Sequence, residues 1–114
     1  MVECLFCRIV KKEIPAQILY EDETVLAFRD VHPQAPVHLL VIPKKHVARV
    51  MDVGAEDLPL VGELHRVIQF LAKTENVQDG GFRIVVNNGP NAGQAVEHLH
   101  YHLLGGRKLG WPPG

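Results

Sequence analysis

Residues 98–104 read His-Leu-His-Tyr-His-Leu-Leu. Three of the seven histidines therefore alternate with apolar residues at a period of two, which is the period of a β-strand. In an extended chain His98, His100 and His102 would project from one face, while the residues between them would face the core. We expect three imidazoles in register on a rigid surface to form either a metal site or a reaction centre.

The residue types of this stretch allow two kinds of chemistry. Alternating histidines can bind zinc through neutral imidazole nitrogens, and a hydrolase built on a metal-bound hydroxide would keep one coordination position open. Alternatively, one imidazole can attack phosphorus itself, because a pKa near about 6.5 leaves it largely unprotonated at neutral pH. The glycine-rich turn Asn87–Ala95 leads directly into the histidines, and backbone N–H groups of such turns can bind an anion. This placement favours a phosphate site beside the histidines.

The histidine pattern resembles the His-x-His-x-His-apolar-apolar signature of the histidine triad (HIT) superfamily. Almost the whole chain is similar to its Hint branch, the nucleoside phosphoramidases. The motifs that carry this resemblance are Ile14-Pro15-Ala16, Asp30–Pro36, Val41–His46, Asn87–Gln94 and Trp111–Gly114. Two positions differ from other branches. The dinucleotide hydrolases typically have Gln at the position of Tyr101, and the uridylyltransferases have Gln at the position of His102.

Length and composition predict one ordinary domain spanning residues 1–114. A chain of 114 residues can bury a single core without disulfides or metals. The formal net charge of −1 gives no reason to expect nucleic-acid or membrane binding. No apolar run approaches the roughly 20 residues of a membrane span, and no signal-like segment follows the first residue. We therefore expect a cytoplasmic protein.

The only two cysteines, Cys4 and Cys7, form a Cys-x-x-Cys pair. A redox pair would precede a helix in a thioredoxin-like βαβ pattern, which is not evident, and a structural disulfide is unusual in the cytosol. Two interpretations stay open: half of a zinc site, or two reduced, partly buried thiols. The resemblance implies that His46 and His98 complete the zinc site, which would be closed, tetrahedral and structural.

Hydrophobic periodicity predicts an α+β fold with about five antiparallel strands and one main helix. The main helix is expected over 56–76, with Asp57 as its N-cap and Pro59 in its first turn. Its apolar stripe comprises Val61, Leu64, Val67, Ile68, Leu71 and Ala72, with His65 beside it, exposed or structural. A helical turn is expected over 8–13, and strands over 18–21, 24–29, 37–42, 82–87 and 98–104. The resemblance adds a homodimer that pairs through the main helix and 82–86, so that the two sheets become continuous.

The resemblance also implies the roles of the site residues. His100 would be the nucleophile, His102 and His38 would set its tautomer, and His98 would support the site. Asp30 would reach the ribose hydroxyls, since carboxylates accept well from a diol. The base pocket would comprise Phe6, Ile9, Ile14, Phe28 and Val31, and the phosphate donors Asn87, Gly93, Gln94, Ala95 and Val96.

The function implied is hydrolysis of a nucleoside 5′-phosphoramidate of AMP or GMP through a covalent nucleotidyl-histidine, with no cofactor required. Trp111, in the C-terminal tail, would dock near the partner subunit's site and help to select the leaving group. Ala95 departs from the branch, where many enzymes have Ser. Three alternatives remain: a nucleotide-binding interaction protein with slow incidental hydrolysis, a dinucleotide polyphosphate hydrolase, and a zinc-binding module.

Overall fold

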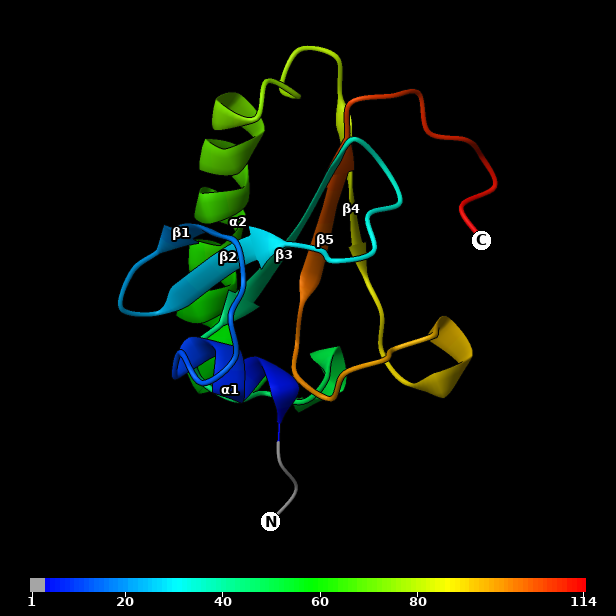
Figure 1. The fold of residues 1–114 in the computed structure, drawn as a ribbon. Helices are drawn as coiled ribbons and strands as arrows, with labels where there is room; N and C mark the ends of the chain where they lie inside the picture. The colour runs from blue at the N-terminus through cyan, green and yellow to red at the C-terminus, as the bar shows by residue number, and fades with distance from the viewer. Residues whose placement is uncertain (1–3) are drawn as a thin grey trace.

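The computed structural model describes residues 4–114, which form a five-stranded antiparallel sheet with two α-helices (Figure 1). The strands lie in the order β1-β2-β3-β5-β4, as expected for an α+β fold. Their bounds and those of the helices are α1 Leu5–Val10, β1 Ile18–Glu21, β2 Val25–Arg29, β3 Val37–Pro43, α2 Leu58–Thr74, β4 Phe82–Val86 and β5 Tyr101–Gly105. Short 3-10 turns cover 50–52, 55–57 and 90–92.

The neighbouring strands β2 and β3 have nearly continuous apolar sequences and are buried on both faces. One set of alternate side chains packs with the stripe of α2 into the larger core; its strand members include Val25, Ala27, Leu39, Val41 and Leu103. The other set packs with Phe6 and Ile9 of α1; its members are Leu26, Phe28, Leu40 and Ile42. The sheet is therefore covered by α2 on one face and by the short α1 on the other.

The main helix α2 is shorter than expected. It begins at Leu58 and ends at Thr74, because the chain over Ala55–Asp57 forms a 3-10 turn instead of α-helix. Asp57 occupies the N-cap position, but its carboxylate makes no capping bond to the helix. It accepts instead from the backbone N–H of Gly54 at 3.2 Å and from Lys45 Nζ at 2.6 Å. Pro59 lies in the first turn as predicted, and the predicted stripe is buried except at Val61, which is only partly buried.

The histidine strand begins later than expected, at Tyr101 instead of His98. The residues before it leave the ladder because other partners take their polar groups. The Leu99 N–H donates to the Val47 carbonyl, and the His98 ring donates to the Pro43 carbonyl. The predicted alternation nevertheless holds, since Leu99 and Leu103 join the α2 core while the three imidazoles face the side of α1.

The first helix lies earlier than the sequence suggests. It spans Leu5–Val10 instead of 8–13 because Cys4 caps it, accepting from the Cys7 N–H at 3.3 Å. Four strand ends also move by one residue: β2 begins at Val25, β3 runs on to Pro43, β4 stops at Val86 and β5 runs on to Gly105. Within residues 4–114, no helix is long and apolar enough to cross a membrane.

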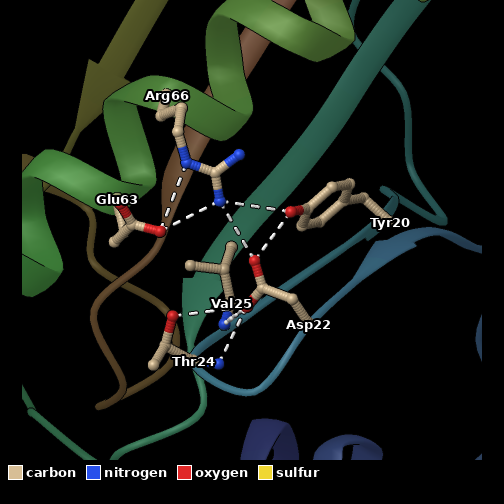
Figure 2. A network of polar contacts seen from close by, with 6 residues as sticks. All are labelled: Tyr20, Asp22, Thr24, Val25, Glu63 and Arg66. Atoms are coloured by element: carbon tan, nitrogen blue, oxygen red, sulfur yellow. Dashed lines mark hydrogen bonds and ion pairs between the residues drawn. The ribbon is translucent and has the colours of Figure 1, made fainter.

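A polar network attaches the β1–β2 turn to α2 (Figure 2). Asp22 accepts from the Tyr20 hydroxyl at 2.7 Å and from the N–H groups of Thr24 and Val25, both at 2.8 Å. Arg66 of α2 reaches the same carboxylate at 3.2 Å. Burial opposes ionisation of Asp22, but these hydrogen bonds outweigh it and lower its pKa to about 2. Asp22 is therefore ionised at neutral pH.

Candidate functional site

One pocket of about 400 Å³ lies on the α1 face of the sheet. It gathers ten predicted nucleotide-site residues: Phe6, Ile9, Ile14, Phe28, Asp30, Val31, Ala95, Val96, His100 and His102. It also brings in six side chains that the sequence did not single out: Leu5, Pro15, Ala16, Arg29, His32 and Leu40. The sequence could have indicated two of these as pocket residues. Leu5 is the neighbour of Phe6, and Leu40 lies two residues after His38 on the same face of one strand.

His100 is held with one specific ring nitrogen free. Its Nδ1 lies 2.7 Å from the carbonyl oxygen of His98, and a carbonyl can only accept, so Nδ1 carries the proton. Nε2 therefore keeps its lone pair, on a side chain that lines the pocket. The Phe6 ring packs edge-on against His100 with centroids 5.2 Å apart. The hydrogen bond thus fixes which of the two ring nitrogens carries the shared proton.

A chain of hydrogen bonds sets the second pair of histidines. The Gln34 N–H donates to His38 Nδ1 at 3.0 Å, so the proton of His38 is on Nε2. That proton is donated to His102 Nδ1 at 2.9 Å, which places the proton of His102 on Nε2. Asp30 lies beside the chain, with Oδ2 3.4 Å from His38 Nε2.

Burial keeps both of these histidines neutral. Desolvation lowers the pKa of His38, although the nearby Asp30 carboxylate opposes the shift. Burial, together with the neighbouring His100 and His38, lowers the pKa of His102 to about 4. At neutral pH His102 is therefore an uncharged donor through Nε2, and its ring is 5.0 Å from that of His100.

The predicted phosphate donors are divided by the structure. Ala95 and Val96 line the pocket, whereas Gln94 holds its own loop together: Nε2 donates to the carbonyls of Ala48 and Val96, and Oε1 accepts from Gly89. In this conformation Gln94 has no free amide proton for a phosphate. Gly93 closes the turn in a left-handed conformation, with φ +82°.

Asn87 lies one residue beyond the end of β4, whose last paired residue is Val86, opposite Tyr101 of β5. The ladder therefore does not place its side chain beside His100. Among the described residues, Asn87, Gly93 and Gln94 are the predicted nucleotide contacts that do not line the pocket.

A second cluster of polar side chains includes His98, two residues before His100 in the chain. Cys4, Cys7, His46 and His98 place four potential ligand atoms within 4.8 Å of one another. His98 Nε2 donates to the Pro43 carbonyl at 2.8 Å, so its Nδ1 carries the lone pair. That lone pair faces Cys4 Sγ at 3.3 Å, Cys7 Sγ at 3.6 Å and His46 Nδ1 at 3.2 Å.

These distances fit a tetrahedral metal site. Zinc–ligand bonds of about 2.3 Å to sulfur and about 2.0–2.1 Å to nitrogen place neighbouring ligands roughly 3.3 to 3.6 Å apart. The remaining measured edge, from Cys7 Sγ to His46 Nδ1, is 3.4 Å. Burial and the neighbouring Cys4 raise the pKa of Cys7 to about 11, a shift that a bound divalent cation would reverse. The four residues could hold Zn²⁺ in a closed site.

Asp30, His38 and His102 also lie close enough to surround an ion, but their protons argue against one. A metal at His38 Nε2 would require the proton on Nδ1, where the Gln34 N–H already donates. The cluster of Asp30, His38 and His102 is therefore built as a hydrogen-bonded relay. The cluster of Cys4, Cys7, His46 and His98 is built as a set of metal ligands.

The C-terminal tail lies away from the pocket of its own chain. Arg83 of β4 holds the tail by donating to the Gly110 carbonyl at 2.8 Å and by lying over the Trp111 ring, 5.9 Å from its centroid. Trp111 is 81% exposed, and it is not among the described residues that line the pocket.

A sheet covered on both faces, with three histidines beside a pocket, is the architecture of HIT proteins, and comparisons with known proteins agree. The model of the HIT domain matches residues 11–109. An uncharacterized HIT-like protein of Synechococcus elongatus is 52% identical, over 98% of this chain and 97% of its own. The crystal structure of a HIT family hydrolase from Legionella pneumophila matches with a TM-score of 0.97 and 49% identity, over 98% of this chain and 100% of its own. The chain belongs to the HIT domain family.

One relative bears on the second cluster. A 14 kDa zinc-binding protein of Zea mays is 49% identical, over 96% of this chain and 87% of its own. A histidine triad protein from Clostridium difficile, 45% identical over 96% of this chain and 97% of its own, matches with a TM-score of 0.91. The fold is thus common to this chain and the two solved structures.

Proposed function

We propose that this protein is a hydrolase of nucleoside 5′-phosphoramidates of the Hint type. The observation that carries the proposal is the His100 Nδ1–H held by the His98 carbonyl at 2.7 Å, because it makes Nε2 the ring nitrogen that is left to attack a substrate in the pocket. A neutral imidazole nitrogen is a competent nucleophile toward phosphorus. The HIT family hydrolases among the structural relatives support the reaction class.

The proposed reaction has two displacements. His100 Nε2 attacks phosphorus, the P–N bond breaks, and the nucleotidyl group is carried on His100. The Nε2 proton of His102 is available to the leaving nitrogen or to a phosphate oxygen, because His38 holds the other side of that ring. Water then attacks phosphorus, which releases the nucleoside monophosphate and regenerates His100.

The pocket suits a purine nucleoside such as that of AMP or GMP. Phe6, Ile9 and Phe28 provide an apolar wall for the base. Asp30 accepts from the His32 N–H through Oδ1 at 2.8 Å, which leaves lone pairs of the carboxylate for the ribose hydroxyls. The ten predicted residues gathered in one pocket support this assignment.

A homodimer paired through β4 is part of the proposal. β4 is an edge strand of the sheet, and open edges are normally protected or paired. Apolar side chains are exposed around it: Ile84 is 37% exposed, Met51 and Trp111 each 81%. Pairing of two β4 edges would join the sheets and bring the tail of one protomer toward its partner.

The proposed zinc is structural, held by Cys4, Cys7, His46 and His98, and the reaction would need no other cofactor. At this site a zinc ion would hold two thiolates and two imidazoles together. The tautomers of His100 and His102 are set by protein groups alone, which supports catalysis by the imidazoles themselves.

A direct assay tests this function. We expect the protein to release AMP from adenosine 5′-phosphoramidate, with rates far above those for a diadenosine polyphosphate. His65→Ala is the matched control, since that histidine is exposed and outside both clusters. Faster cleavage of the diadenosine polyphosphate would instead assign the protein to the dinucleotide hydrolases.

A nucleotide-binding interaction protein with slow hydrolysis is the second candidate. It is favoured by two observations in the phosphate turn: Ala95 lacks a hydroxyl, and the amide protons of Gln94 are engaged inside the loop. Tight AMP binding with negligible turnover of every phosphoramidate tested would support it over the enzyme.

A further inference from the structure

The Cys/His cluster joins three segments that are far apart in the chain. Cys4 and Cys7 belong to the start of α1, His46 follows β3, and His98 precedes β5. α1 is the element that the cluster caps. It has six residues, too few to be stable alone, and its N-cap is the Cys4 sulfur.

The same short helix forms one wall of the nucleotide pocket. Leu5, Phe6 and Ile9 of α1 all line it. Phe6 packs edge-on against Phe28, with centroids 5.4 Å apart, and against His100 at 5.2 Å. It also packs against His98, with centroids 6.0 Å apart. The position of α1 therefore sets the shape of the pocket beside the nucleophile.

His98 links the two clusters through opposite parts of the residue. Its Nδ1 faces the sulfur atoms, while its carbonyl oxygen accepts the proton that fixes the His100 tautomer. The ring is fully buried. A change in how the ring is held therefore reaches the nucleophile across a single residue.

We propose that metal binding by Cys4, Cys7, His46 and His98 controls nucleotide affinity by positioning α1 and the His98 carbonyl. This inference rests on the proposed function and adds a regulatory role to its pocket. None of the four ligand residues is among those that line the pocket, and His98 connects the cluster to His100 through its carbonyl oxygen. Loading with zinc docks α1 and completes the pocket wall; removing zinc loosens that wall while the sheet and α2 stay folded on their own core.

Thermodynamic linkage makes the coupling measurable in both directions. If zinc tightens AMP binding tenfold, AMP must tighten zinc binding by the same factor. We expect a coupling of about tenfold or more, within the range usual for coupled sites. A zinc ion that merely stabilised the whole fold would leave the AMP affinity of the folded apoprotein unchanged.

The test compares the zinc-loaded and the chelated full chain. AMP affinity is measured by calorimetry, and amide hydrogen exchange of 5–10 is followed against that of β3. We expect zinc to tighten AMP binding at least about tenfold and to slow exchange in α1, with little change in β3. Equal AMP affinity in the two forms, or equal exchange in α1, would overturn the inference.

Two variants separate positioning from general loosening. Cys7→Ser should lose the zinc response of both AMP affinity and exchange, and should raise KM more than it lowers kcat. Lys12→Ala is the matched control: it removes the 2.7 Å contact with Glu21 at the other end of this segment and should keep the full zinc response. Loss of the response in Lys12→Ala as well would contradict a role specific to the cluster.

The failures of the two proposals are distinguishable. If AMP binds to neither form, the proposed function fails and the control of nucleotide affinity fails with it, whatever the exchange of α1 shows. If AMP binds and phosphoramidates are cleaved equally well with and without zinc, the function stands and the inference fails.

Discussion

His98 and His100 lie two residues apart on the same face, yet their ring protons are placed in opposite ways. His98 donates through Nε2 to the Pro43 carbonyl and turns the Nδ1 lone pair to the two cysteines. His100 donates through Nδ1 to the His98 carbonyl and keeps the Nε2 lone pair at the pocket. One backbone carbonyl in each case decides which ring nitrogen carries the proton, and in our proposal this makes His98 a metal ligand and His100 the nucleophile.

The comparison extends to the neighbours of each ring. Around His98 the cluster consists of cysteine and histidine side chains, which are common metal ligands, and their sulfur and nitrogen atoms point toward one another. Around His100 the neighbouring histidines form a donor–acceptor sequence from Gln34 to His102. Convergent lone pairs attract a cation, whereas a directed sequence of donors orients a proton.

The largest expected effect comes from removing the nucleophile. His100→Ala should lower kcat/KM for adenosine 5′-phosphoramidate by about 10⁴-fold or more, because the covalent route is lost. Zinc content should stay at the wild-type level, since this ring is outside the ligand set. Steady-state kinetics measures the loss of activity, and metal analysis measures the zinc content. Substantial activity in the variant would mean that His100 is not the nucleophile.

Removing a ligand should give the converse result. His46→Asn should weaken zinc binding at least about 100-fold, measured by competition with a chelator. A covalent nucleotidyl-His100 should still form at saturating substrate, because this histidine contacts neither His100 nor His102. His65→Ala again serves as the control, and unchanged zinc affinity in His46→Asn would show that the cluster is not a metal site.

Interrupting the relay should have an intermediate effect. His38→Ala removes the donor to His102 Nδ1 and should lower kcat about 10- to 100-fold. His38→Gln restores an N–H donor at this position and should recover part of the activity. Equal activity of the two variants would mean that the hydrogen bond to His102 does not orient the proton.

The relay also predicts a pH dependence. The pKa of His102 is about 4 in the folded protein and about 6.5 in an unfolded chain, so the unfolded chain takes up a proton first as the pH falls. Stability from this group is complete above about pH 6.5 and declines toward pH 4. An NMR titration of the His102 ring should have its midpoint near pH 4; a midpoint near 6.5 would contradict a buried neutral donor.

The smallest effect is expected in the phosphate turn. Ala95→Ser adds a hydroxyl at the pocket wall and should raise kcat/KM roughly twofold to tenfold, the worth of one hydrogen bond. Zinc affinity should not change. A fall in activity would show that Ala95 is selected for packing against the substrate and that the turn needs no further donor.

The sequence predicted the sheet, the main helix and the shared face of the three histidines, because a period of two survives even where the ladder ends. It misplaced the start of β5, since nothing in the local pattern shows that Pro43 and Val47 would take the polar groups of His98 and Leu99. It also placed α1 too late, because a cysteine is not a usual N-cap.

The site was predicted largely through resemblance, and its limits follow from long-range contacts. The apolar pocket residues could not be told from core residues by periodicity, and the role of Gln94 depended on loop hydrogen bonds that close only in the folded chain. The tautomers of His98 and His100 were beyond reach, because each is set by a carbonyl whose position requires the fold.

The central claim is that His100, and not a metal ion, attacks phosphorus. The most direct test is mass spectrometry of the rapidly quenched reaction with adenosine 5′-phosphoramidate, run after removal of zinc and at saturating substrate. Because a nucleotidyl-histidine is acid-sensitive, the quench must avoid acid. The account predicts a nucleotidyl adduct on the wild-type peptide containing His100 and none in His100→Ala. An active His100→Ala protein, or activity that disappears with zinc and leaves no adduct, would contradict it.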